Sequence, residues 1–242
     1  MQQVTTTAVI TAITSDSNVA PPPAKPEKKF IRYIHDFRGI AIIYVVAAHV
    51  LVAWPEGSPV RKVLDIIFQN STILFLFIAG YLFQHLSKNF EYKDYLVKKF
   101  QNVISPYLII SVPILIYRLY TQDIPGFTAL EHPDFANWSL WDQGTYYMLH
   151  GAHLQQLWFI PMIALYYLIS PLLIYIDRHP KLYVVLVPLI AISLVIHRSS
   201  LSDTLTMAVH FLSVYVFGMF LSRYKDAYLE FAKKYWLLIT VL

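Results

Sequence analysis

The stretch RYIHDFRGIAIIYVVAAH, at positions Arg32–His49, decides how this chain folds. It opens with charged side chains, continues as an apolar run suited to a lipid bilayer, and ends on a histidine. An ionisable side chain at membrane depth is energetically costly, so one that is retained there is by default a functional candidate. On a single α-helix, Arg38 and His49 would project from nearly the same face, roughly 16 Å apart along the axis. The two side chains would therefore share a face without touching.

The composition of the whole chain is that of a membrane protein. Its 242 residues are 57% hydrophobic and 14% charged, with a mean hydropathy of +0.49. A soluble domain carries about a quarter charged residues, so this chain lacks the side chains that would cover a water-exposed surface. The absence of cysteine excludes disulfides, thiolate nucleophiles and cysteine-ligated metals.

Seven apolar segments predict an all-α, polytopic bundle of about seven transmembrane helices. Their approximate limits are residues 34–54, 63–83, 100–120, 157–176, 182–196, 204–222 and 235–242. Residues 31–242 would form this transmembrane domain. The Thr-, Ala- and Pro-rich residues 1–30 predict a disordered cytoplasmic tail that lacks the pattern of a cleaved export signal. Because the last apolar run reaches Leu242 before it attains spanning length, we expect a truncated C-terminus.

The distribution of Lys and Arg predicts the orientation of these helices. With the N-terminus in the cytoplasm, fifteen of the nineteen basic residues fall on the inner side and four on the outer side. The four on the outer side are Arg61, Lys62, Arg118 and Arg198. The same bias accounts for the net charge of +4, so we expect no nucleic-acid partner.

The segment at residues 121–156 would then lie outside the membrane. It contains Trp138, Trp141, Tyr146 and Tyr147 and has no Lys or Arg. Aromatic side chains of this kind form belts at membrane interfaces, and their flat faces also suit stacking on sugar rings. Both interpretations stay open from the sequence.

Four stretches, taken in chain order, are similar to motifs of a single family. The first is Arg38–His49, and the others are FLFIAGYLF at 75–83, YLVKKFQNVISPY at 95–107, and LWFIP at 157–161 followed by 166–173. Together they resemble the acyltransferase 3 family, integral membrane enzymes that O-acylate cell-surface glycans and related acceptors. The resemblance covers about residues 32–173 and implies the N-terminal part of a longer bundle of about ten spans.

The resemblance implies an O-acyltransferase of a bacterial-type inner membrane, with its N-terminus in the cytoplasm. The enzyme would move an acyl group, acetyl in the first instance, from cytoplasmic acyl-CoA to a hydroxyl of a surface or exported glycan or of a lipid-linked sugar. Acyl-CoA would be a co-substrate, and the bilayer and the sugar acceptor would be the other partners. We expect no permanently bound cofactor and no metal.

Acyl transfer from a thioester to a hydroxyl requires a base that takes the alcohol proton, and histidine titrates close to neutrality. We therefore expect His49 to be the catalytic base, with a covalent acyl-histidine as the less favoured variant. The phosphates of acyl-CoA require cations at the cytoplasmic face. The predicted donor-binding residues are Arg38, Arg32, Lys98 and Lys99. The pantetheine arm would then reach along the first helix toward His49.

The chain departs from the family pattern where the donor would bind. Members commonly carry an acid three positions before the Arg-Gly pair, where this chain has His35, with Asp36 displaced by one. Both residues are expected to support the site. The paired arginines of the family would fall at Lys99 and Asn102. Since lysine lacks the planar fork of arginine and asparagine has no charge, donor binding is expected to be weaker or differently built.

Each candidate also has a structural interpretation. His49 could simply hydrogen-bond a neighbouring helix. Arg38 could anchor the first helix at the membrane surface, and Lys98 and Lys99 could serve only to set the topology. These alternatives stay open from the sequence.

Two glycines and three further histidines favour structural roles. Gly39 and Gly80 are expected to allow close helix packing. His150 and His153 are three residues apart and could share a helical face, but no third metal ligand is evident nearby. His210, in the sixth apolar segment, is expected to pack in the core.

Other functions also stay open. The acyl group could be another, such as succinyl, or the acceptor could be something other than a sugar. A small-solute transporter would also combine many spans with buried polar residues, although only Pro188 indicates a broken helix and no repeat is visible. A truncated, non-catalytic family member is the third alternative.

Overall fold

The computed structural model describes residues 32–55, 57–68, 71–196 and 203–235. Within these residues every regular element is helical. The α-helices are α1 (Arg32–Val50), α2 (Pro59–Phe68), α3 (Ser71–Leu86), α4 (Tyr92–Lys99), α5 (Ser105–Thr121), α6 (Gly126–Glu131), α7 (Leu140–His150), α8 (Phe159–Leu168), α9 (Ser170–Arg178), α10 (Leu186–Val195), α11 (Thr204–Arg223) and α12 (Lys225–Lys234). The predicted tail at 1–30 and most of the last apolar segment lie outside the described residues.

Three helical stretches of the described chain are long and apolar enough to cross a membrane: Pro59–Asn89, Tyr92–Thr121 and Thr204–Arg223. A fourth span results if α8 and α9 count as one helix bent by 55°. The stretch Pro180–Val195, which contains α10, is apolar but shorter. The prediction of an all-α membrane protein is confirmed. The prediction of seven spans is not confirmed. The other predicted segments of the described chain form helices that are too short or too polar to meet the criteria for a span.

The bend between α8 and α9 has a local cause. Pro171 follows Ser170 and has no backbone N–H, so the carbonyl of Tyr167 loses its helical donor. The Ser170 hydroxyl donates to that carbonyl instead, at 2.7 Å. A serine thus satisfies the backbone group that the proline leaves without a partner, as the membrane interior requires.

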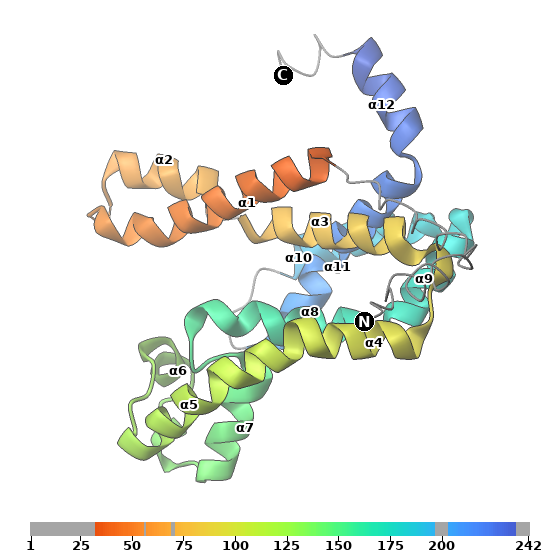
Figure 1. Cartoon of the computed structure of the whole chain (residues 1–242). Helices are drawn as coiled ribbons and strands as arrows, with labels where there is room; N and C mark the ends of the chain where they lie inside the picture. The colour runs from red at the N-terminus through yellow and green to blue at the C-terminus, as the bar shows by residue number, and fades with distance from the viewer. Residues whose placement is uncertain (1–31, 56, 69–70, 197–202, 236–242) are drawn as a thin grey trace, which may run out of the picture.

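The helices form two layers that meet around α11 (Figure 1). One layer holds α1, α2 and α3, and the other holds α4, α5 and α8. The central helix α11 contacts α3, α8, α9 and α10. Its Met207, Phe211, Val216 and Met219 are all buried and form the main core together with side chains of α3, α8 and α9.

Two glycines bring α3 and α11 into backbone contact. A Cβ atom on Gly80 would overlap the carbonyl oxygen of Tyr215, and a Cβ atom on Gly218 would overlap the carbonyl oxygen of Phe77. Small residues that let helix backbones approach closely are typical of membrane helix interfaces. The prediction for Gly80 is confirmed. The prediction for Gly39 is wrong, because a Cβ there would meet nothing within 4 Å.

The segment predicted to be an outer loop folds into α6, α7 and connecting turns. Phe135, Tyr146 and Tyr147 are buried in a cluster of their own, against side chains of α5. Trp141, in contrast, is 81% exposed. The aromatic residues of this segment are therefore divided between a small core and the surface.

His153 connects this unit of α6, α7 and their turns to α5. Its Nδ1 donates to the carbonyl of Tyr147 at 3.0 Å, and its Nε2 accepts from the Ser111 hydroxyl at 2.8 Å. The side chain is completely buried, and burial lowers the pKa of His153 below its ordinary value. The expectation that His150 and His153 share a helix face is wrong, because α7 ends at Gly151, whose φ of +68° breaks the helix.

Candidate functional site

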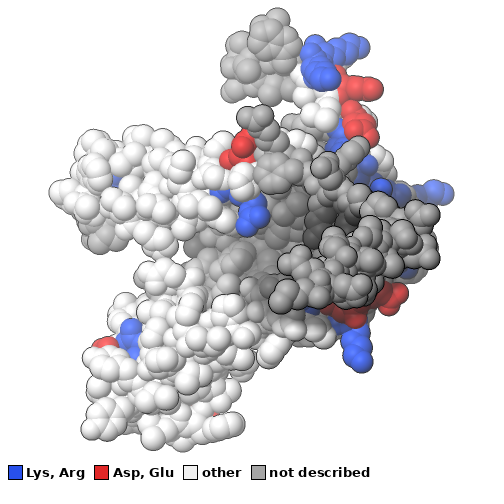
Figure 2. Space-filling view, in the orientation of Figure 1, with Lys and Arg blue, Asp and Glu red and all other residues white. Residues whose placement is uncertain are grey.

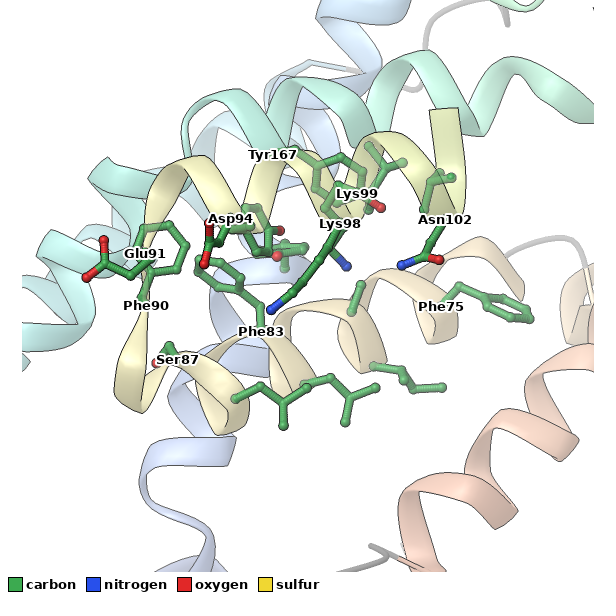
Figure 3. A pocket seen from close by; sticks show the side chains of 18 of the residues that line it. Phe75, Phe83, Ser87, Phe90, Glu91, Asp94, Lys98, Lys99, Asn102 and Tyr167 are labelled. Carbon is green, nitrogen blue, oxygen red and sulfur yellow. The ribbon is translucent and has the colours of Figure 1, made fainter. Parts of the chain in front are cut away.

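A cavity of about 610 Å³ lies between the two layers and brings together cations from separate helices. Arg38 reaches it from α1, and Lys98 and Lys99 reach it from the end of α4. Figure 3 shows Lys98, Lys99 and Asn102 extending from the α4 side toward α3. Three of the four predicted donor-binding residues therefore line one cavity.

The position of α1 follows from its packing on α3. Ile34 and Ala41 are buried in this contact, and the rings of Phe37 and Phe77 meet edge to face with centroids 6.0 Å apart. The hydroxyls of Tyr33 and Tyr81 form a hydrogen bond of 2.5 Å. Arg38 follows directly after Phe37, so this contact fixes the turn of α1 that carries it.

Lys99 is held against two aromatic rings. Its Nζ lies 5.0 Å from the ring centroid of Tyr167 in α8 and 5.4 Å from that of Tyr95 in α4. A cation over the face of an aromatic ring is attracted by the ring quadrupole. Neither Lys98 nor Lys99 forms an ion pair within the described part of the chain. Both charges are thus available to an anionic ligand.

Asn102 lines the cavity from the irregular turn that follows Lys99. Residues Phe100–Ile104 form a π-helical turn between α4 and α5. Such turns are rare and occur frequently at functional sites. The two positions that the family resemblance assigns to paired arginines, Lys99 and Asn102, both line the cavity.

The remaining wall of the cavity is mainly aromatic. Tyr95 packs against Phe83, Phe90 and Tyr167, with ring centroids 5.5, 5.3 and 5.9 Å away. Tyr215, which meets Gly80 at the crossing of α3 and α11, also lines the cavity. A molecule with an anionic part and a long uncharged part would find partners for both here.

Acidic side chains reduce the positive charge of the cavity without cancelling it. Glu91 and Asp94 line its edge, against the three cations. Both carboxylates are exposed to solvent. The cavity therefore keeps an excess of positive charge on the side formed by Arg38, Lys98 and Lys99.

His49 lies elsewhere on α1. It occupies the last turn of the helix, is exposed, and is not among the described side chains that line the cavity. Because α1 is continuous from Arg32 to Val50, Arg38 and His49 do lie on one helix, roughly 16 Å apart along its axis. The prediction that one helix carries both residues is confirmed, while the role of His49 as a base stays a prediction.

Two other predicted residues of α1, His35 and Asp36, are not among the described side chains that line the cavity. Arg32 is the first residue of the helix, and its side chain lies outside the described part of the structure, so its role stays a prediction. His35 and Asp36 have exposed side chains, and Asp36 forms no ion pair with Arg38 within the described structure. Residues two apart on a helix do not face each other. The supporting roles of His35 and Asp36 stay predictions.

Sequence reasoning missed the tyrosines of the site. Tyr95, Tyr167 and Tyr215 come from three different helices, and nothing in their local sequence distinguishes them from core residues. Tyr95 and Tyr167 do fall within the stretches that resemble family motifs, which was the only available signal. His210 packs as expected, with its Nδ1 2.8 Å from the carbonyl oxygen of Ile196.

Comparison with known proteins adds a family assignment. A family model described as an acyltransferase domain matches residues 31–242, which is most of the chain. The comparisons with curated proteins and with solved structures each found no match. The match includes the cavity, α1 with His49, and all described helices beyond residue 173, where the motif resemblance had faded. This membrane protein therefore belongs to the acyltransferase 3 family.

Proposed function

We propose that the chain is a membrane O-acyltransferase that transfers an acyl group from cytoplasmic acyl-CoA to a hydroxyl of a surface or exported glycan. The observation that carries the proposal is that Arg38 of α1 and Lys98 and Lys99 of α4 line one cavity with an aromatic wall. Acyl-CoA combines phosphates with a long uncharged arm. Charge-assisted hydrogen bonds from the cations would bind the phosphates, and the aromatic wall would pack against the arm.

His49 is the proposed base. The acceptor hydroxyl oxygen would attack the thioester carbonyl as His49 takes the hydroxyl proton. Collapse of the intermediate would break the carbon–sulfur bond, and the CoA thiolate would recover the proton from the imidazolium. Arg38 and His49 share one helix, so a donor bound near Arg38 would extend its acyl end along α1 toward the base.

The membrane topology is part of the proposal. We place the protein in an inner membrane with a cytoplasmic N-terminus. We expect α1, α10 and the apolar segment at residues 235–242 to complete a set of about seven spans within a longer bundle. The surface charges support this orientation. Lys and Arg on the face shown in Figure 2 are concentrated on the right, where α4 begins and α9 and α12 lie. Positive charges gather on the cytoplasmic side of membrane proteins.

Membranes that contain the chain test this proposal. Wild type, His49→Ala, Arg38→Gln and Lys93→Gln are compared at matched expression with labelled acetyl-CoA, and label is counted in the glycan fraction. Lys93 is an exposed cation of α4 outside the cavity lining and serves as the matched control. The proposal predicts transfer by wild type and Lys93→Gln and its loss in the other two variants. Full transfer by His49→Ala would refute the proposed base.

The identity of the acyl group is tested in the same membranes. Succinyl-CoA replaces acetyl-CoA as the donor, and a lipid-linked sugar replaces the glycan fraction as the acceptor. Transfer from succinyl-CoA but not from acetyl-CoA would assign succinyl as the acyl group, and the proposed mechanism would stay the same. Silence of the wild type with every donor, together with uptake of a labelled solute, would favour the transporter alternative.

A further inference from the structure

A second cavity, of about 410 Å³, lies where several helix ends converge. The end of α3 and the turn after it, the end of α9, the end of α11 and the start of α12 all contribute side chains. Four cations line it: Lys88, Arg178, Arg223 and Lys225. All four belong to the set of basic residues for which the sequence predicts a cytoplasmic position.

The single carboxylate of this cavity is already occupied. Asp177 is buried and accepts a hydrogen bond from the Tyr183 hydroxyl at 2.8 Å. It also pairs with the Arg223 guanidinium at 3.2 Å and lies 3.4 Å from the Gln84 amide nitrogen. Asp177 therefore holds Arg223 in place and has little capacity left for other cations.

The other three cations have no such partner. Lys88, Arg178 and Lys225 form no ion pair among the residues that the structure describes. Cations near helix C-termini are favoured by the helix dipole alone, and three of the converging helix ends are C-termini. The dipole alone does not explain why these cations surround an open cavity. A buried hydroxyl also belongs to the lining of this cavity.

That hydroxyl belongs to Ser222, in the last turn of α11. The residue is 4% exposed, and its Oγ has no surface open to a molecule in the cavity. The Tyr81 hydroxyl lies close to this Oγ. Ser222 therefore belongs to the wall of the cavity, and the binding groups that face a ligand are the cations.

We infer that this second cavity binds a phosphate group. Phosphate oxygens accept hydrogen bonds from guanidinium and ammonium groups together, and arginine matches their geometry with two parallel donors. The first cavity has three cations against two carboxylates, whereas this one has four against one that is already paired. The second cavity therefore has the larger excess of positive charge.

Two kinds of molecule could supply the phosphate group that this cavity binds. One is the nucleotide end of acyl-CoA, a source that rests on the proposed function. Ser87 lines both cavities, so they adjoin. A donor whose diphosphate is bound by the cations of the first cavity could place its ribose 3′-phosphate in the second. The other is the headgroup of an anionic lipid, since basic pockets between helices on the cytoplasmic side bind such headgroups.

The test measures binding by the full chain, purified in a neutral detergent, without any acyl transfer. The probes are adenosine 3′,5′-bisphosphate and water-soluble short-chain phosphatidylglycerol, with short-chain phosphatidylcholine for comparison. The variant pair is Arg178→Gln with Lys225→Gln. Lys233→Gln is the control, an exposed cation of α12 outside the cavity lining. Arg223 is left unchanged because its loss would leave the buried Asp177 carboxylate without its ion-pair partner.

The expected result is that wild type and Lys233→Gln bind one phosphate probe alike, and that the variant pair binds it at least about tenfold more weakly. Loss of adenosine 3′,5′-bisphosphate binding assigns the nucleotide as the source, and loss of phosphatidylglycerol binding assigns the lipid. Equal binding by wild type and the variant pair, or no binding of either probe, overturns the inference. Phosphate binding without acyl transfer by the same preparation would count against the proposed function only.

Discussion

The side chains of Arg38, in α1, and Lys99, at the end of α4, line the same cavity although they come from opposite layers of the fold. Neither helix alone would bind a phosphorylated ligand well. The pairing depends on the packing of α1 on α3 and on the aromatic contacts of Tyr95 with Phe83 and Tyr167. The site is therefore a product of the tertiary fold and can be perturbed one helix at a time.

Removing the charge of Lys99 should weaken donor binding more than it slows the chemical step. Lys99→Met keeps the length and the apolar stem of the side chain but removes the ammonium that lies over Tyr95 and Tyr167. We expect the KM for acyl-CoA to rise roughly tenfold with a smaller change in kcat, because the cation contacts the donor in both ground and transition states. Steady-state kinetics in membranes provide the measurement.

Lys93→Met is the matched control for this change, since Lys93 is exposed on α4 away from the cavity. Its kinetic constants should equal those of wild type. A fall in kcat at unchanged KM for Lys99→Met would show that Lys99 acts on the reacting atoms and would contradict its role in donor binding.

The glycine contact between α3 and α11 should be intolerant of even one methyl group. Gly80→Ala and Gly218→Ala each place a Cβ atom against a backbone carbonyl that cannot move independently of its helix. We expect each change to lower the free energy of unfolding by about 1–3 kcal/mol, the usual range for overpacking. Thermal unfolding of the purified chain, followed by circular dichroism, measures the effect.

Gly39→Ala is the corresponding control in α1. Its Cβ would meet nothing within 4 Å, and alanine favours a helix over glycine by about 1 kcal/mol. The variant should therefore be as stable as wild type or slightly more stable. Equal destabilisation by all three substitutions would contradict the role of the close contact, because helix propensity alone favours alanine at each of these positions.

Hydropathy identified the apolar helices of the described chain, but not the more polar helices α4, α6, α7 and α12. It also did not show how many helices span the membrane. The charged first turns of α1 and the shortness of α10 separate these helices from the three that meet the length and polarity of a span. The bend at Pro171 was also not predicted, because its effect depends on a hydrogen bond from Ser170. Apolar segments reveal the tendency to be buried, whereas the span count depends on the length and polarity of each helix.

The site was predictable in part. Charge and family resemblance identified Arg38, Lys98 and Lys99, because cations near a membrane surface stand out in an apolar chain. The tyrosines around Lys99 and the second basic cavity depend on contacts between distant helices, which periodicity does not encode. The error at His150 and His153 has a local cause, since Gly151 adopts a left-handed conformation that ends α7 between them.

Acid should destabilise the unit formed by α6 and α7 through His153. Burial lowers the pKa of this side chain below its ordinary value of 6.5, so the unfolded chain takes up the proton more readily than the folded chain. The folded chain should keep its full stability above about pH 6.5 and lose stability as the pH falls below it. His150, whose pKa is also lowered by burial, should add to the loss.

The measurement is the apparent melting temperature of wild type and His153→Gln at pH 7.5 and pH 5.5. The variant should melt at a lower temperature than wild type at pH 7.5, because Ser111 and the Tyr147 carbonyl lose well-placed partners. Its melting temperature should also change less with pH. An unchanged pH dependence in His153→Gln would exclude His153 as the group responsible.

The carboxylate of Asp177 should be a structural requirement at the junction of α9, α11 and the segment that leads to α10. It accepts from Tyr183, pairs with Arg223 and lies near Gln84. Asp177→Ala leaves the Tyr183 hydroxyl without its acceptor and the partly exposed Arg223 without its anion. We expect a loss of about 1–3 kcal/mol in the free energy of unfolding, the usual cost of buried hydrogen-bonding groups left unpaired.

Asp226→Ala, at an exposed position of α12, is the matched control and should leave the unfolding transition in place. Unchanged stability of Asp177→Ala would mean that other contacts hold Arg223 in place. The carboxylate of Asp177 would then serve only to reduce the positive charge of the second cavity.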